Sequence, residues 1–583
     1  MPSFRAPELH AAAFCAWHPS FKPGKNFVLL ISIAFPEYSL IFNHTLSKEK
    51  LIKLLSGISC EKAIAILSRF ASLHIGVCQQ NQDACQLDWS LRVAHSNHIQ
   101  KMGGNWIAYN QFKTIMCLQA IFELEKWALL YCPVKKKLSP ILLPDLLLIM
   151  DAILAINDRL PKGEVSGHET EYLYLTLYHN THKNIKDQIA RAYYVFSTLA
   201  KRNPKMAVFL TCYEQMRGFS LEDRLTVLFD SLTNVISRFT ITDMFTKGLC
   251  VTVEDFDAKG LAPVYEKILK TIRIDYTIAK KNASKTIDQV WNFEPFYRFP
   301  FVQIEALQFA FSETTIVYQM WEGLYWDVRY TFKTDGEKFM TLFGQPFEQY
   351  VREIAKASAD SSEGNVKFQD EFLYKYKGQH RASTDCYFRI SNTLVAIEAK
   401  AKSPHSSTLT GPNRAAIDVE VTELMFYPTK QVCKRLKEIY SKDSDIAESK
   451  SGFFDGIERT IILAVCMEKV QPIGELLLEF DKMIAPDISE TNIVAYHSIN
   501  IEEFEVICNL IELCPAELPK IFAEWFADQR KDVRSAVALA NYLSSRQKPY
   551  SCSQYVSQLF NESLREISTK TFGKDLTSEQ DHC

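Results

Sequence analysis

The stretch STDCYFRISNTLVAIEAKAK, residues 383–402, decides the fold of this chain. Its two β-rich runs, 384–390 and 393–401, are separated by only two residues and therefore predict a β-hairpin. The second run contains the apolar segment Leu394–Ile397, which is typical of a buried central strand. We therefore expect a sheet at this point of the chain.

Charged side chains gather at one end of this hairpin. Glu398 and Lys400 share a strand face because alternate side chains point the same way, whereas Ala399 faces the opposite side. The hairpin brings Asp385, near the start of the first strand, beside that pair. Two adjacent carboxylates repel each other unless a cation lies between them, and Mg²⁺ prefers such oxygen ligands. The hairpin thus predicts a site for Mg²⁺ or Mn²⁺, with Lys400 placed to orient a metal-activated water or to offset transition-state charge.

A plainer interpretation of these residues also exists. Glu-x-Lys is common on solvated strands, so the alternative is an unrelated α/β domain with a surface ion pair. Charges at the end of a buried strand are harder to explain as ordinary surface, which favours a functional site.

The elements around the hairpin predict an α/β domain. They alternate in type along the chain and are bounded by turn residues. The expected helices are 336–357, 429–440 and 501–513, and the further expected strands are 366–376, 460–467 and 492–497, with loops at 403–413 and 441–456.

The first half of the chain has a different pattern of apolar residues. Apolar residues at i, i+3 and i+4 spacing predict packed amphipathic helices. They fall at 48–56, 61–74, 111–130, 186–200, 220–237 and 261–279, with two β-like runs at 26–34 and 38–42. We expect four regions: a mostly helical region at 1–300 for regulation or recognition, aromatic-rich connecting helices at 301–339, the α/β domain at 340–513, and C-terminal helices at 514–583. The aromatic residues of 291–326 favour packing over a base-stacking surface.

Composition limits the classes of function. The 583 residues carry a formal net charge of -3, with 66 Lys and Arg against 69 Asp and Glu, so any nucleic-acid contact must come from a local patch. The 15 cysteines form no C-x-x-C pair, and no P-loop or G-x-S-x-G motif is present. The apolar segment 138–156 contains two prolines and two aspartates, which predicts a buried helix rather than a membrane span. These features predict a cytoplasmic protein with free thiols and no membrane contact.

The order helix, strand, strand with Asp385, strand with Glu398-x-Lys400, helix resembles the PD-(D/E)xK nuclease superfamily, which has the restriction-endonuclease-like fold. The resemblance covers about residues 340–510, and Thr384 stands where many members have proline. It implies an α/β core with a central mixed sheet flanked by helices, preceded by the large helical region and followed by a short helical tail. It also implies further site residues on the flanking helices and strand. These are Glu348 (Glu353 is the weaker candidate) in the metal shell, the Ala399 carbonyl as a metal ligand, and Gln431 on the following helix with Lys434 one turn on.

The resemblance implies a metal-dependent endonuclease that hydrolyses phosphodiester bonds, in DNA more than in RNA. By analogy, bacterial restriction or antiphage defence is a setting for it, with a regulatory partner protein or a homo-oligomer to control cleavage. The alternative is a module of the same fold that binds nucleic acid or a protein without cutting.

Overall fold

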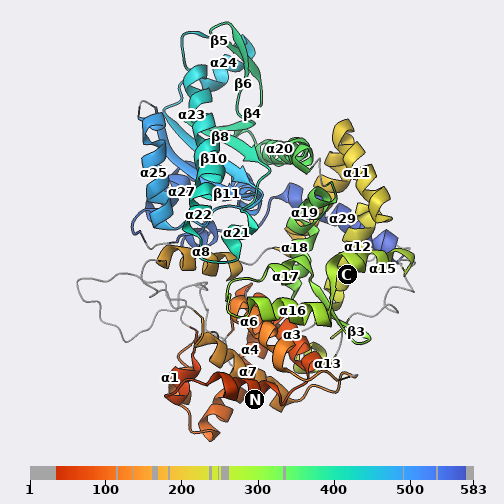
Figure 1. Ribbon diagram of the computed structural model, residues 1–583. Coiled ribbons are helices and arrows are strands. Elements are labelled where there is room, and N and C mark those ends of the chain that lie inside the picture. Colours follow the sequence, from red (N-terminus) through yellow and green to blue (C-terminus); the bar gives the residue numbers. More distant parts are fainter. Residues whose placement is uncertain are drawn as a thin grey trace, which may run out of the picture.

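The computed structural model describes residues 35–572, except 80, 113, 115, 136, 161–167, 181–183, 236–238, 247–248, 251–261, 333–335, 490 and 534–535. A large helical region precedes a mixed five-stranded sheet with its helices, and a helical tail follows, as the sequence predicts (Figure 1). The β-like run 26–34 lies outside the described residues.

The helical region is built from many short elements. Its helices are α1 (Tyr38–Phe42), α2 (Lys48–Leu55), α3 (Cys60–Cys78), α4 (Gln82–Lys101), α5 (Trp106–Tyr109), α6 (Leu118–Tyr131), α7 (Leu143–Asn157), α8 (Glu169–Asn180), α9 (Ile185–Ala192), the π-helix η1 (Tyr193–Leu199), α10 (Ala200–Arg202), α11 (Pro204–Arg217), α12 (Leu221–Val235), α13 (Ile241–Thr246), α15 (Ala262–Ile272), α16 (Tyr276–Thr286), α17 (Glu294–Arg298), α18 (Glu313–Met320) and α19 (Glu322–Thr331). A small sheet of β1 (Arg273–Asp275), β2 (Phe301–Ile304) and β3 (Leu307–Ala310) lies among them.

Four of the segments predicted in this region need correction. The run 38–42 is the helix α1, because Ile41 is fully buried where α1 packs on α7, and this tertiary contact overrides the β-propensity of the segment. The expected helix at 261–279 is interrupted by β1, which pairs in parallel with β2. The expected helix at 111–130 begins only at Leu118. The segment 301–339 opens with the β2–β3 hairpin and only then becomes helical.

The apolar segment 138–156 forms most of α7, whose residues Ile149 to Ile156 are buried apart from Asp151. None of the helices that the structure describes combines the length and apolar character needed to cross a membrane.

The α/β region is built on a sheet of strand order β11-β10-β8-β7-β4. Its strands β8, β10 and β11 run parallel, whereas β7 is antiparallel to both β8 and β4. The strands are β4 (Lys367–Asp370), β7 (Cys386–Ile390), β8 (Thr393–Lys400), β10 (Arg459–Cys466) and β11 (Ile493–Asn500), and a second sheet contains β5 (Leu373–Tyr376), β6 (Gln379–Ala382) and β9 (Ser444–Asp445).

Helices connect and cover this sheet, and others form the tail. They are α20 (Gly336–Ser361), α21 (Ser406–Leu409), α22 (Arg414–Glu420), the π-helix η2 (Val421–Phe426), α23 (Tyr427–Ile439), α24 (Glu448–Phe454), α25 (Gly474–Ile488), α26 (Ile501–Leu513), the 3₁₀-helix η3 (Pro515–Glu517), α27 (Leu518–Gln529), α28 (Leu539–Ser545) and α29 (Gln554–Phe572). Helix α25 was not predicted, and it supplies the crossover that parallel strands β10 and β11 require. The expected strand 366–376 divides into β4 and β5, and the expected loop 441–456 contains β9 and α24.

Alternation along β8 separates two apolar cores. Val395, Ile397 and Ala399 belong to the core that includes α20 and α26, whereas Leu394 and Ala396 belong to the core that includes α23 and α25. The sheet is therefore buried on both faces, which explains the continuous apolar run in the sequence.

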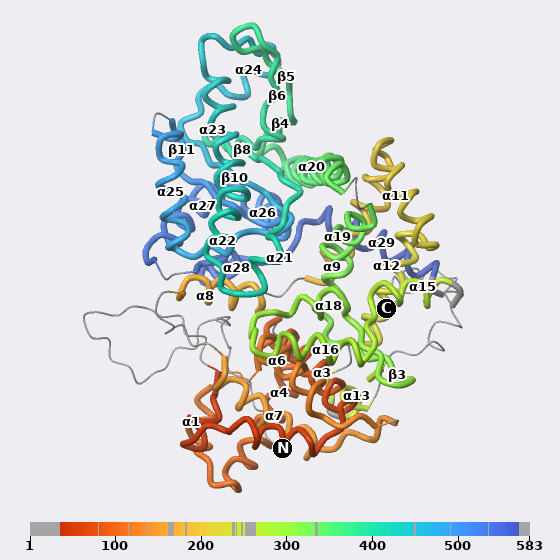
Figure 2. Tube along the Cα trace, viewed as in Figure 1, coloured from red at the N-terminus to blue at the C-terminus, as the bar shows by residue number. Residues whose placement is uncertain are grey.

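The first of these cores crosses the predicted boundary near residue 300. It contains residues of α9, η1 and α12 together with residues of β7, β8 and β10. Figure 2 shows the C-terminal helix α29 beside the helical region, where it packs on α9 and α12. The boundaries at 300, 340 and 513 stay predictions about independent folding, but the apolar packing is continuous across all three.

Buried ionic groups accompany this continuous packing. Arg191 of α9 donates from Nε and Nη2 to the two carboxylate oxygens of Glu505 on α26, at 2.9 and 2.7 Å. The Tyr350 hydroxyl of α20 donates to the same carboxylate at 2.7 Å. Because all three side chains are buried, this network joins the helical region to the helices beneath the sheet.

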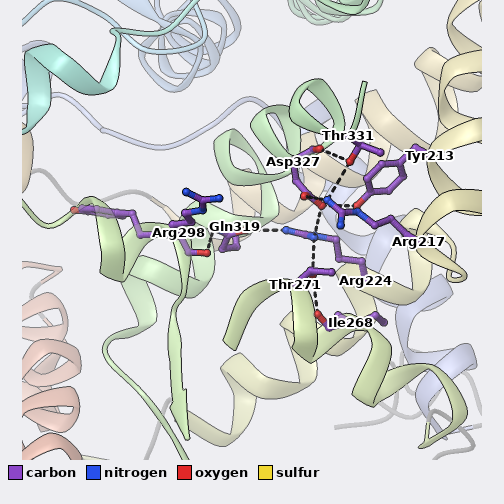
Figure 3. Close-up of polar contacts among 10 residues, drawn as sticks. Tyr213, Arg217, Arg224, Ile268, Thr271, Arg298, Gln319, Asp327 and Thr331 are labelled. Atoms are coloured by element: carbon purple, nitrogen blue, oxygen red, sulfur yellow. Dashed lines mark hydrogen bonds and ion pairs between the residues drawn. The ribbon is translucent and has the colours of Figure 1, made fainter. Parts of the chain in front are cut away.

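A second polar network holds the helical region itself together (Figure 3). Asp327 of α19 accepts hydrogen bonds from Arg224 of α12 at 2.8 Å and from Tyr213 of α11 at 2.7 Å, and it also pairs with Arg217. Arg224 reaches Gln319 of α18 at 2.7 Å. One carboxylate thus joins three helices, and Arg224 adds a fourth.

Arg191→Met tests the buried pair. We expect a loss of about 3–5 kcal/mol in unfolding free energy, because Glu505 is left as an uncompensated buried charge. Urea unfolding followed by tryptophan fluorescence measures it.

Lys356→Met is the matched control, because its pair with Asp360 is exposed and is worth at most about 1 kcal/mol. The double variant Arg191→Met/Glu505→Leu should recover much of the loss. Equal midpoints for Arg191→Met and Lys356→Met would show that this pair does not join the two regions.

Candidate metal site

The order of elements brings the predicted site residues together. Helix α20, strands β4, β7 and β8, helix α23 and strand β10 follow one another along the chain and lie side by side in the fold. The β7–β8 register pairs Cys386 with Ile397, and continuing it by one residue places Asp385 opposite Glu398. Residues opposite each other on neighbouring strands project from the same face. The two carboxylates therefore face each other at the end of β8.

Only one of the two carboxylate oxygens of Glu398 accepts hydrogen bonds from described residues. Its Oε1 accepts from Lys400 Nζ at 2.5 Å and from Gln431 Nε2 at 2.6 Å. Its Oε2 is buried and has no hydrogen-bond partner among the described residues. Such an atom costs free energy unless it is satisfied by another group, so it is the place where a cation would fit.

Asp385 is fixed by the backbone of β8. Its Oδ2 accepts from the Ala399 N–H at 2.7 Å. In a strand the N–H and C=O of one residue point to the same side, so the Ala399 carbonyl is also directed toward Asp385. The carbonyl that the sequence predicts as a ligand is thus on the correct side of the strand.

The helices bring the remaining predicted residues to the site. Gln431 lies in the first half of α23 and touches Glu398 directly. Glu348 is half-buried on α20, and its charge is close enough to affect the pKa of Glu398. Glu353 is engaged elsewhere, since its Oε2 accepts from the Tyr194 hydroxyl at 2.6 Å and its Oε1 from Gln349 at 2.9 Å. Glu348 is therefore the glutamate of α20 that faces the site.

The carboxyl groups of the site disfavour ionisation. Burial and the charge of Asp385 raise the pKa of Glu398 to about 8, although Lys400 opposes this rise. Burial and the charge of Asp385 also raise the pKa of Glu348 to about 7. Burial raises the pKa of Asp385 despite the Ala399 hydrogen bond. A divalent cation would reverse these shifts by supplying the missing positive charge.

Two residues near the site were not predicted. Glu371 follows β4, and burial and the charge of Asp385 raise its pKa. Arg352 of α20 lies 3.6 Å from Glu371 and 3.5 Å from Asp370. The i, i+4 spacing from Glu348 could have identified Arg352, whereas Glu371 depends on the antiparallel pairing of β4 with β7.

The site has two features that limit its chemistry. Among the described residues, no set of three or more His, Cys, Asp or Glu side chains is arranged to hold a metal ion. The carboxylates are also little exposed, at 9% for Asp385 and 2% for Glu398. Mg²⁺ commonly uses one or two carboxylates and takes its other ligands from water and substrate phosphate, so two side chains and one carbonyl are compatible with it.

Comparison with known proteins adds no relative: no family model, no curated protein and no solved structure matches the chain. The case for a function therefore depends on the geometry of these residues.

Asp385→Asn tests whether the site holds a cation. Mg²⁺ or Mn²⁺ should raise the melting temperature of the unchanged protein, because a ligand at about 100 times its Kd adds about 2.7 kcal/mol. The variant should lose this effect, since an amide is a weaker ligand than a carboxylate. Differential scanning calorimetry with and without metal measures it. Asp360→Asn, which changes an exposed carboxylate near the end of α20, is the matched control and should respond to metal normally. An unchanged metal response in Asp385→Asn would contradict the site.

Metal affinity should also depend on pH. Below about pH 7 to 8, Glu348 and Glu398 hold protons that a cation must displace, so affinity should rise with pH by up to tenfold per unit for each proton released. Titration calorimetry of Mn²⁺ in buffers of different ionisation enthalpy counts these protons. Glu348→Gln should release fewer protons and flatten the pH profile. A metal affinity that does not change between pH 6 and pH 8 would contradict the assignment of both glutamates.

Proposed function

We propose that this protein is a metal-dependent nuclease of the PD-(D/E)xK type, which hydrolyses phosphodiester bonds with Mg²⁺ or Mn²⁺. One observation carries the proposal. One oxygen of the buried Glu398 carboxylate accepts from Lys400 and Gln431, the other has no hydrogen-bond partner in the part of the chain that the structure describes, and the carboxylate lies across from Asp385. The order of helix, three strands, helix and strand around it supports the same superfamily.

Each side chain has a separate task in this proposal. Asp385, Glu398 and the Ala399 carbonyl would hold the cation, which lowers the pKa of bound water and offsets charge on the phosphate when it is present. Glu348 would hold or release a proton at the edge of this shell. Gln431 orients the Glu398 carboxylate by donating to its Oε1. Lys400 presents a cation to the scissile phosphate, where negative charge grows in the transition state.

The target and the setting are further parts of the proposal. DNA is favoured over RNA by the resemblance to restriction endonucleases, and defence of a bacterial cell against foreign DNA is the setting that the analogy offers. A cytoplasmic nuclease needs control, for which the helical region, a partner protein or a second copy of the chain would be available.

One observation favours the alternative, a module of the same fold that binds without cutting. The two carboxylates are nearly closed to solvent, and Lys400 lies directly on Glu398, so the site must open before a phosphate can enter. A binding module would keep this closed ion pair permanently.

Lys400→Ala separates cleavage from binding. The charge of Lys400 is not needed to hold a cation, so the variant should keep its fold and its metal response. Loss of a preorganised charge at the reacting centre is typically worth ~3–4 kcal/mol, or roughly 10²–10³ in rate. The full-length protein is incubated with supercoiled plasmid and Mg²⁺ or Mn²⁺, with and without a chelator, and single-turnover rates are compared.

Lys482→Ala, an exposed lysine of α25, is the control and should cut at the unchanged rate. Lys400→Arg should rescue poorly, because its wider guanidinium cannot take the position of an amine. Chelator-sensitive nicking that survives in Lys400→Ala would remove the assigned role of this lysine. Binding without cleavage, across several metals and substrates, would favour the module.

A further inference from the structure

A small hairpin is inserted between two neighbouring strands of the sheet beside the candidate site. β5 and β6 pair with each other between the end of β4 and the start of β7, and β9 pairs with the other side of β5. We call residues 373–382 the wing. Figure 1 shows the wing with α24 at the outer end of α23, projecting away from the helical region. The wing therefore lies next to the site without being part of the main sheet.

The wing is anchored on α23. Tyr374 is buried, and its hydroxyl donates to Glu438 at 2.6 Å. Gln431, which touches Glu398, lies seven residues earlier on the same helix. The intervening turns of α23, about 10 Å of helix, thus connect the candidate metal site to the wing.

Cationic side chains lie on this part of α23 and on the wing. Lys434 and Arg435 follow Gln431 by three and four residues, the spacing of neighbours on one side of a helix. Arg381 of the wing is the cross-strand partner of Tyr374, so it projects from the same face of the hairpin. Arg435 is also near the site, since its charge opposes the raised pKa of Glu371.

These cations are poorly neutralised. Lys434 and Arg381 form no ion pair with any described acidic residue, and Arg381 donates only to Gln379 at 2.7 Å. Arg435 has a long contact to Glu438, at 3.4 Å, and lies beside the Tyr374 hydroxyl. The Nε atoms of Arg381 and Arg435 are both buried and have no hydrogen-bond partner within the described part of the chain.

We propose that Arg381, Arg435 and Lys434 bind a backbone phosphate of a nucleic-acid strand, one or two nucleotides from the phosphate at Glu398. This inference depends on the proposed function for the identity of the site beside it. Planar guanidinium groups match phosphate oxygens, and a lysine adds a flexible point charge. One turn of α23 separates Gln431 from Arg435, about 6 Å, which compares with ~3.4 Å per nucleotide along a duplex.

The same feature resolves a difficulty raised by composition. The chain has a net charge of -3, so bulk charge cannot attract nucleic acid. A local patch of three cations beside the scissile position would position a strand without making the whole surface basic. The wing would then contact the nucleic-acid strand through Arg381, beside the residues of α23 that contact it.

Fluorescence anisotropy tests the proposal with the full-length protein, with Ca²⁺ and again with EDTA so that cleavage cannot intervene. The probes are a labelled 30-bp DNA duplex and single-stranded DNA and RNA of the same length. Arg381→Gln and Arg435→Gln should each weaken binding of at least one probe about 5- to 10-fold. The triple variant with Lys434→Gln should also reduce the slope of log K against log salt by about 0.7–0.9 for each phosphate that the protein no longer neutralises.

Arg459→Gln is the matched control, because Arg459 is exposed at the start of β10, the opposite end of the sheet from the site. Arg381→Lys and Arg435→Lys keep the charge and should retain part of the affinity, which guards against variants that only damage the fold. Near-ultraviolet circular dichroism checks folding.

The outcomes separate this inference from the proposed function. Binding that falls in the Gln variants, by a protein that never cuts, would support the phosphate site and contradict the nuclease. Cleavage and binding unchanged in the triple variant would overturn the phosphate site and leave the nuclease intact. Absence of binding to all three probes by the unchanged protein would also overturn the phosphate site.

Discussion

The pairing of Arg191 with Glu505 is the interaction on which the arrangement of this molecule most depends. It joins α9, from the helical region, to α26, which packs against the sheet, and Tyr350 of α20 completes the carboxylate. A buried ion pair that has lost its hydration is tolerated only when its geometry is nearly ideal. The Arg191–Glu505 pair therefore restricts the position of α9. Helix α20 is fixed by the same network, and it is the helix that carries Glu348. The helix that carries Glu348 is thus held by a network that includes a residue of the helical region.

The site brings several acidic groups together with one lysine. Three carboxyl groups approach one another in a buried place, and Lys400 is the cation that touches one of them directly. The raised pKa of Glu398 and of Glu348 expresses the cost of this arrangement. Proteins concentrate such costs at functional sites, because a substrate or a cation can relieve them. Charges of the opposite sign lie beyond the site: Arg381 of the wing forms no ion pair with a described acidic residue, and Arg435 of α23 contacts Glu438 at 3.4 Å.

Local pattern predicted much of the sheet region. The run from Leu394 to Ile397 identified the central strand, and the two-residue turn before it identified the hairpin, since both depend on neighbours in sequence. Period-two alternation also placed Glu398 and Lys400 on one face. Propensity failed where long-range contacts dominate: the run 38–42 is helical because Ile41 packs against α7, and the helix at 261–279 is broken because β1 finds a partner in β2. The predicted strand 366–376 merged β5 with β4 because the turn between them is only two residues long.

The sequence by itself determined which residues make up the candidate site, because residue identity and strand periodicity are local properties. Asp385, Glu398, Lys400 and the glutamine of α23 could be named without any coordinates, and the structure brings them together. Only the tertiary structure decided which groups surround them. The approach of Glu371 needs the pairing of β4 with β7, and the choice of Glu348 over Glu353 needs the rotation of α20 against the sheet. The place of the wing beside α23 needs the contact of Tyr374 with Glu438. Each of these depends on contacts between residues far apart in the chain, whose free energy comes from burial and charge in the assembled fold and leaves no local trace in the sequence.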